Sequence, residues 1–281
     1  MRLARFGPLR QEKPALVDAQ NRLRDASSLA PDWTPAFFQS GGLEKLRNVN
    51  PDTLPLAPAD ARLGSCVPRP GKLIGIGLNY ADHAAESGMA IPAEPIVFLK
   101  ATNTVVGPND DVLIPRGSEK TDWEVELGVV IARETRYLAS LADAAACIAG
   151  YCVSNDVSER TFQLERGGQW TKGKSCDTFN PLGPWLVTPD EISDPSNLGL
   201  RLWVNDEPRQ NGNTRTMIFN VPHLIHYLSQ FMTLEPGDVI TTGTPPGVGL
   251  GMKPPRYLHA GDVVTLEIDH LGRQRSTCRP A

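Results

Sequence analysis

Two glutamates in the segment 121–131 have the residue type and spacing for metal binding. Glu124 and Glu126 lie two residues apart in "TDWEVELGVVI", a run otherwise typical of a buried strand. Side chains alternate between the faces of a strand, so these two share one face, roughly 7 Å apart. The common use of alternating glutamates is a half-exposed strand with both on the solvent side. The GVVI tail instead indicates burial on both faces, where unpaired like charges are costly, so we expect a divalent cation to pair with both.

A third carboxylate follows another predicted strand. Asp156 comes at the end of "YCVSNDVS" (151–158), a strand that runs into a polar turn. Three carboxylates form a hard oxygen donor set, which favours Mg²⁺, Mn²⁺ or Ca²⁺ over zinc or copper. Such a set would leave coordination positions open for water and substrate.

The elements that must position these residues are mostly short strands. Apolar runs predict strands within 72–80, 94–100, 107–115, 121–131 and 151–158, and Gly-Asp turns precede further strands within 236–243 and 260–269. An Ala-rich helix is expected over 141–150. The clearest helix lies within 219–238, where Val221, Leu224, Ile225, Leu228 and Phe231 or Met232 recur at helical spacing.

The first 70 residues have a different character. Residues 1–30 predict a hairpin, residues 31–70 show no clear periodicity, and residues 55–72 predict an irregular connector. We therefore expect a small N-terminal β domain over 1–70 and a catalytic domain over 71–281. The 25 prolines and 25 glycines suit many short strands and ordered loops. The predicted fold class is α+β and rich in β structure.

Composition excludes several partners. The net charge of −4 gives no basic surface for nucleic acid. The five cysteines are odd in number and form no CxxC pair, so neither a disulfide framework nor a zinc site is expected. No apolar run reaches the roughly 18–20 residues that a membrane span needs, and the N-terminus lacks the apolar core of a signal peptide. We expect a cytoplasmic protein.

Several motifs together resemble the fumarylacetoacetate hydrolase family. They occur in the family's order and cover roughly residues 70–270; they are "GLNYADHAAE" (77–86), "DWEVELGVVI" (122–131), "NDVSER" (155–160), "KGKSCDTFNPLGPW" (172–185) and "GDVITTGTPPGVG" (237–249). The resemblance implies a mixed β-sandwich roll for the catalytic domain. It also implies a dimer, or an assembly of dimers.

The resemblance assigns metal and catalytic roles. Glu124, Glu126 and Asp156 match the positions that bind Mg²⁺ or Mn²⁺ in the family, and Ca²⁺ could replace these ions in a crystal. His83 and Glu86 match a dyad that activates water, and their i, i+3 spacing puts both on one face of a helical turn. A lone histidine near a strand end would otherwise be read as structural. Lys174 is expected to neutralise developing negative charge.

Substrate contacts are also implied by the matching positions. Gln163 and Thr244 match residues that contact the substrate, while Lys100 and Arg160 are weaker candidates, since Arg160 could simply pair with a nearby carboxylate. Residues 84–95 are rich in small residues and are expected to form a mobile lid that brings His83 over the substrate. His223 and His226 are expected to be structural or exposed.

The implied reaction is cleavage of a C–C bond between two carbonyls of a small anionic 2-oxo acid. The resemblance looks strongest to a bacterial subgroup that acts on 2,4-diketo-3-deoxy sugar acids, such as the L-fuconate type, and it implies an acylpyruvase-type hydrolase that releases pyruvate and a second acid. Oxaloacetate decarboxylation and isomerisation or decarboxylation of 5-carboxymethyl-2-hydroxymuconate remain alternatives on the same metal site. Ureidoglycolate lyase chemistry fits the residues less well. A non-enzymatic, metal-stapled binding protein would leave His83, Glu86 and Lys174 unexplained.

Overall fold

Two β-sheets dominate the computed structural model, which describes residues 1–86 and 88–281. Within these ranges the larger sheet has nine strands, in the order β3 (Leu23–Asp25), β2 (Lys13–Val17), β1 (Arg2–Phe6), β13 (Leu186–Val187), β10 (Ile148–Asn155), β9 (Val125–Ile131), β16 (Val239–Thr241), β4 (Leu73–Gly77) and β5 (Ile96–Lys100). The smaller sheet has five, in the order β15 (Glu207–Asn213), β14 (Gly199–Val204), β17 (Val263–Ile268), β18 (Gly272–Pro280) and β7 (Val112–Ile114). The expected β-rich α+β class is confirmed.

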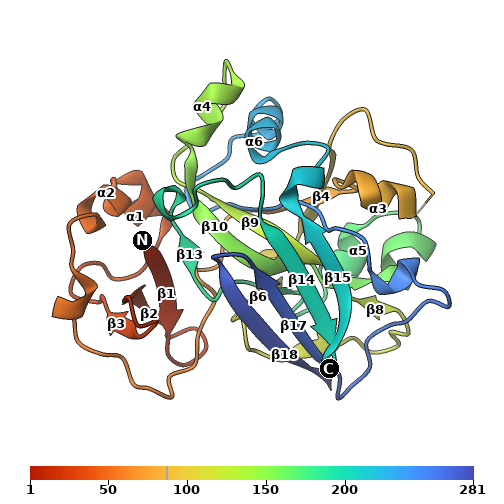
Figure 1. Cartoon of the computed structure of the whole chain (residues 1–281), viewed down its shortest axis with the longest axis horizontal. Coiled ribbons are helices and arrows are strands. Elements are labelled where there is room, and N and C mark those ends of the chain that lie inside the picture. Colours follow the sequence, from red (N-terminus) through yellow and green to blue (C-terminus); the bar gives the residue numbers. More distant parts are fainter. Residues whose placement is uncertain (87) are drawn as a thin grey trace.

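Short elements surround the two sheets. Two small strand pairs join β8 (Thr121–Asp122) to β11 (Ser158–Glu159), and β6 (Val105–Val106) to β12 (Asn180–Pro181). The helices are α1 (Pro35–Gln39), α2 (Gly42–Leu46), α3 (Ala81–Glu86), α4 (Leu141–Ala145), α5 (Thr171–Lys174) and α6 (Val221–Ser229). In Figure 1, α4 and α6 lie together at the top, whereas α3, α5 and β8 gather on the right. Within the described part of the chain, no helix is both long enough and apolar enough to cross a bilayer.

The two faces of β9 explain how a buried strand can carry charges. Its odd-numbered residues, from Val125 to Ile131, pack into the core between the two sheets. On the opposite face, Glu126 is followed by Gly128 and then by Val130, which belongs to a second apolar core. A Cβ at Gly128 would lie 2.8 Å from Cys152 Sγ, so this position holds no larger residue without displacing its neighbour. One face of the strand therefore passes from charged to apolar along its length.

The predicted strand over 121–131 is interrupted. Residues 121–122 form β8, which pairs with β11, and β9 begins only at Val125, where it pairs with β10. Glu124 lies in the gap between them. Its N–H donates to Asn155 Oδ1 at 3.2 Å, and its carbonyl accepts from Asp156 N–H at 3.0 Å. The break turns Glu124 out of regular pairing and ties it to the end of β10.

Two helix expectations need correction. The Ala-rich helix ends at Ala145 rather than at 150, because Ile148 already pairs with Ile131 as the first residue of β10. Helix α6 ends at Ser229, and its buried stripe includes Val221, Leu224, Ile225 and Leu228 as expected. Beyond its end, Met232 packs against the core while Phe231 is exposed. In the Ala-rich segment, pairing with β9 overrides local helix propensity.

The N-terminal residues join the larger sheet. The expected hairpin is present as β1 and β2, and β1 also pairs with β13 of the catalytic part. Leu3, Trp33 and Phe38 share an apolar core with Leu73 and Val130. The segment 31–70, in which the sequence shows no clear periodicity, contains the short helices α1 and α2. The division into domains near residue 70 stays a prediction.

A buried carboxylate in the β2–β3 turn should make the stability of the fold depend on pH. Burial alone would raise the pKa of Asp18, but hydrogen bonds from Arg22 and Arg24 hold that pKa well below its usual value. A depressed pKa stabilises the fold above the unfolded-state value of about 4, and this contribution is lost as the pH falls below it. We expect Asp18→Asn to lower the urea midpoint at pH 7, with a difference from wild type that shrinks at pH 3. The exposed Asp60, changed to Asn, serves as the control, and a difference independent of pH would contradict this account.

Candidate metal centre and its cavity

Three buried carboxylates meet where β9 and β10 lie side by side. One oxygen each of Glu124, Glu126 and Asp156 can be chosen so that all lie within 4.8 Å of one another. The antiparallel register brings them together, because Ser154 pairs with Glu126 and Asn155 with Val125. Asp156 follows directly and closes the group. The structure thus brings together the three predicted metal ligands.

A chain of hydroxyl groups orients Glu126. Its Oε2 accepts from Thr241 Oγ1 at 2.5 Å and from the N–H of Gly243 at 2.7 Å. Thr241 Oγ1 lies 3.3 Å from Ser154 Oγ, which in turn accepts from the amide of Asn180 at 3.2 Å. Thr241 has a single hydroxyl proton, and the shorter of its two contacts assigns that proton to Glu126. These bonds hold one oxygen of Glu126 and leave the other for a ligand.

Basic side chains surround the carboxylates. The Lys174 ammonium donates to Glu124 Oε2 at 2.7 Å and to Asp156 Oδ2 at 2.6 Å. The Arg160 guanidinium lies 2.7 Å from Glu124 Oε1 and 2.8 Å from Asp122 Oδ2. Lys100 pairs with the other oxygen of Asp156. The Lys174 ammonium therefore lies between two of the predicted metal ligands.

The carboxylates of the cluster outnumber its basic side chains. Among the described residues, four buried carboxylates (Asp122, Glu124, Glu126, Asp156) meet three buried cations (Lys100, Arg160, Lys174). Burial raises the pKa of Glu126 well above its usual value, and the charges of Asp156 and Glu124 raise it further. Burial would also raise the pKa of Glu124, but Lys174 and Arg160 hold it well below its usual value. A divalent cation would favour the ionised form of Glu126, and it suits a donor set made of hard carboxylate oxygens.

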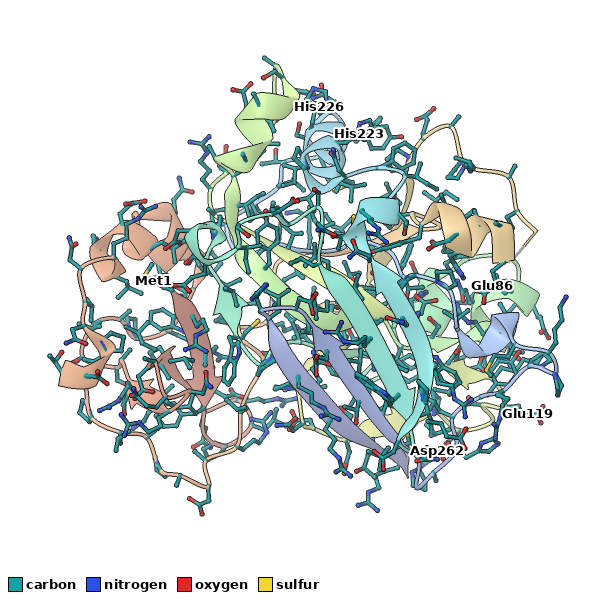
Figure 2. The ribbon with its side chains drawn as sticks, in the orientation of Figure 1. Met1, Glu86, Glu119, His223, His226 and Asp262 are labelled. Atoms are coloured by element: carbon teal, nitrogen blue, oxygen red, sulfur yellow. The ribbon has the colours of Figure 1, made fainter. Side chains whose placement is uncertain are left out.

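The predicted dyad lies over the same space. His83 Nδ1 is 3.2 Å from Glu86 Oε2 on α3. Both oxygens of Glu86 accept from the N–H of Gly247 at 3.2 Å, so α3 is docked on the loop that follows β16. Figure 2 shows Glu86 on the side of the molecule far from Met1. The dyad is formed as its spacing predicts.

A cavity of about 520 Å³ is lined both by the His83–Glu86 pair and by Glu124 and Glu126. Polar groups on its lining include His83, Glu86, Glu124, Glu126, Arg160, Gln163, Lys174 and Thr244. The remaining wall is largely apolar and includes Leu78, Met89, Phe98, Leu164, Trp170, Val248, Leu250 and Met252. Lys253 adds a positive charge, and among the described residues it has no ion-pair partner. The lining therefore combines charged groups with a largely apolar wall.

The predicted substrate-binding residues divide into two groups. Gln163, Thr244 and Arg160 line the cavity. Gln163 lies in a π-helical turn (Thr161–Glu165), a feature often found at functional sites, and accepts from Arg160 at 3.0 Å. Lys100 does not line the cavity. Its ammonium is buried beneath Asp156 and donates to the carbonyl of Phe179 at 2.8 Å, so we correct its assignment from substrate binding to support of Asp156.

Some expectations concern residues outside the cavity. His223 and His226 lie on α6, at the top of Figure 2, and His223 stacks between Phe219 and Tyr227. In the expected lid over 84–95, Ser87 lies outside the described residues. Glu94 accepts from the Tyr227 hydroxyl at 2.5 Å, which ties the end of this segment to α6. The mobility of the segment stays a prediction.

Sequence reasoning missed two residues that support the site. Asp122 accepts from the backbone N–H groups of Gly249 and Leu250 and pairs with Arg160. It could have been suspected as the first acid of "DWEVE". Gln210 reaches the site from the smaller sheet and donates to Thr244 Oγ1 at 2.7 Å. No local pattern marks Gln210, because its partners lie far away in the sequence.

The chain is similar to known proteins along its whole length. The family described as fumarylacetoacetate (FAA) hydrolase C-terminal matches residues 72–279. A protein of Burkholderia multivorans, named a hydrolase without a stated substrate, is 58% identical over all of both chains. Fumarylacetoacetate hydrolase from psychrophilic Exiguobacterium antarcticum superposes with a TM-score of 0.89 at 33% identity, covering 100% of both chains. Maleylpyruvate hydrolase from Sphingobium sp. SYK-6, in complex with manganese(II) and pyruvate, superposes at 0.80 with 31% identity, again over 100% of both.

Proposed function

Because the chain belongs to the fumarylacetoacetate hydrolase family, a family of enzymes, we propose that it is a divalent-metal-dependent hydrolase of 2,4-diketo acids. Its substrate would be an acylpyruvate-type acid, cleaved between the two carbonyls to pyruvate and a second acid. One observation carries the proposal: the His83–Glu86 pair lines the same cavity as Glu124 and Glu126, two of the three clustered carboxylates.

Glu124, Glu126 and Asp156 would hold Mg²⁺ or Mn²⁺. When bound, the cation supplies Lewis-acid stabilisation of the negative charge that develops on the 2-oxo acid. The manganese and pyruvate bound by the similar maleylpyruvate hydrolase support this assignment. Lys174 lies beside the same carboxylates and would attract the anionic end of the substrate. Its ammonium also lies 5.1 Å from the centre of the Phe98 ring, which helps hold it at the cavity.

His83 is placed to act as the base. If Nδ1 donates its proton to Glu86, the other ring nitrogen, Nε2, is left unprotonated and can accept a proton from water. As that proton leaves, the water oxygen bonds to the acyl carbonyl carbon. The C–C bond then breaks, and its electrons pass to the pyruvate half as an enolate. The proton held by His83 is returned to the enolate carbon, so the reaction consumes one water and needs no oxidant.

The apolar cavity wall indicates what kind of second acid the reaction would release. Leu164, Trp170, Leu250 and Met252 offer few hydrogen bonds to a chain of hydroxyl groups. Between a simple acylpyruvate and a 2,4-diketo-3-deoxy sugar acid, this wall favours the acylpyruvate. We retain the sugar acid as a substrate to be tested. Assembly as a dimer and a cytoplasmic location remain proposals.

The proposal predicts activity that depends on a metal. Exhaustive chelation should reduce hydrolysis of acetylpyruvate to background, because the three carboxylates alone cannot stabilise negative charge on the substrate. Adding Mg²⁺ or Mn²⁺ should restore the activity. Loss of the diketone absorbance measures the reaction. The same assay should include a diketo-deoxy sugar acid, oxaloacetate and 5-carboxymethyl-2-hydroxymuconate. Full activity after chelation would exclude a metal-dependent reaction, and turnover of oxaloacetate alone would favour decarboxylation.

A further inference from the structure

Strand β15 contributes one side chain to the interior beneath the cavity. It forms an edge of the smaller sheet, and of its residues, all of them described, only Gln210 is buried. The pairing with β14 shifts next to it: Leu202 pairs with Gln210, but Trp203 pairs with Pro208, so Arg209 is an extra residue. A bulge of this kind changes the direction of neighbouring side chains and is frequent next to active sites. The bulge accompanies the inward turn of Gln210.

Gln210 completes the pairing of β9 where a neighbouring strand has ended. β16 pairs with β9 from Val130 to Gly128 and stops at Thr241. Beyond that point Val125 has no strand partner on this side among the described residues. Its N–H donates to Gln210 Oε1 at 2.9 Å, and its carbonyl accepts from Thr244 Oγ1 at 2.9 Å. Side chains thus replace backbone pairing at the residue between Glu124 and Glu126.

The same amide holds the loop that receives the dyad. Gln210 Nε2 donates to Thr244 Oγ1 at 2.7 Å and to the carbonyl of Pro245 at 2.8 Å. Tight packing reinforces this contact. A Cβ at Gly247 would lie 2.0 Å from the Arg209 carbonyl oxygen, and Gly247 has φ +103°. Gly247 is also the residue whose N–H binds Glu86. Gln210 therefore contacts both the metal-ligand segment and the loop on which α3 is docked.

We propose that Gln210 is a positioning residue that holds the Glu124–Glu126 segment and the Thr244–Gly247 loop in register. Its amide donates and accepts at once, which a hydrocarbon or a singly functional side chain of the same size could not do. The assignment rests on the proposed metal centre. It also gives Thr244 a positioning role besides the predicted substrate contact, because the Thr244 hydroxyl already binds the Val125 carbonyl and the Gln210 amide.

The test compares two buried glutamines. Gln210→Met removes the amide at nearly constant volume. Gln274→Met is the matched control: Gln274 is fully buried in the same sheet and donates to the carbonyls of Val153, Pro181 and Gly183, but does not line the cavity. We expect Gln210→Met to weaken Mn²⁺ binding by about 10- to 100-fold in calorimetric titration without substrate, as for other losses of groups that orient metal ligands. Gln274→Met should lower the melting temperature but bind Mn²⁺ like the wild type.

A second variant covers the case in which Gln210→Met does not fold. Thr244→Val removes the other side-chain bond to Val125 and should also weaken Mn²⁺ binding. In the double variant the two losses should not add, because the residues act through one network. Wild-type affinity in Gln210→Met, or in Thr244→Val if only that variant folds, would overturn the assignment of Gln210, as would equal weakening in Gln274→Met. Absence of Mn²⁺ binding by the wild-type protein would instead overturn the metal centre itself and the assignment with it.

Discussion

Glu126→Gln is expected to abolish divalent-metal binding and turnover together. The change keeps the volume of the side chain, and its amide oxygen can still accept from Thr241 and Gly243. It removes a carboxylate whose pKa is raised by burial and by the charges of Asp156 and Glu124, and with it one of the three clustered oxygen donors. Lewis-acid stabilisation is worth several kcal/mol, so turnover should fall by on the order of 10³-fold or more.

The measurement is Mn²⁺ titration alongside the acetylpyruvate assay. Asp238→Asn provides the control, since Asp238 is also fully buried but lies at the other end of β16, where it accepts from the N–H groups of Lys72 and Glu235. This variant should lose stability and keep metal binding. Normal Mn²⁺ affinity in Glu126→Gln would remove Glu126 from the ligand set.

His83→Gln should have the opposite pattern: metal binding is kept while hydrolysis is lost. His83 lines the cavity, but among the described residues it makes no hydrogen bond to any of the three carboxylates. Its loss therefore leaves the donor set unchanged. A general base contributes typically about 10² to 10⁴-fold, and we expect a decrease in kcat within that range. Glutamine cannot accept a proton at neutral pH, which makes it a test of chemistry rather than of shape.

The control for His83 is His226→Gln on α6, which is remote from the cavity lining and should have wild-type kcat. Loss of Mn²⁺ binding in His83→Gln would show that α3 helps to build the metal centre. If the variant hydrolysed acetylpyruvate at the wild-type rate and failed only with oxaloacetate, the dyad would not be the water-activating group.

Two of the candidate metal ligands could be proposed from the sequence because they lie close together in it. Glu124 and Glu126 are two residues apart, although Glu124 lies just before β9, and Asp156 directly follows β10, the strand that pairs with β9. The His83–Glu86 pair needs only one helical turn. The motif order then identified the family, which the match over residues 72–279 confirms.

Other features depended on contacts between distant segments. The interruption of the strand at Trp123–Glu124 arises because β8 and β9 pair with different partners. The Ala-rich run before β10 stops being helical where β9 offers a pairing edge. Lys100 carries the right charge for a substrate contact, yet the position of Asp156 above it excludes it from the cavity.

By itself the sequence determined the kinds of atoms available: carboxylates two apart on a strand, a histidine and a glutamate on one turn, and a lysine nearby. Their spacing follows from backbone geometry, which is the same in every strand and helix. Only the tertiary structure decided which of these groups face a common space and what holds them there. Gln210 shows why: its three bonds reach residues 34, 35 and 85 positions away, and neither periodicity nor a motif encodes such distances.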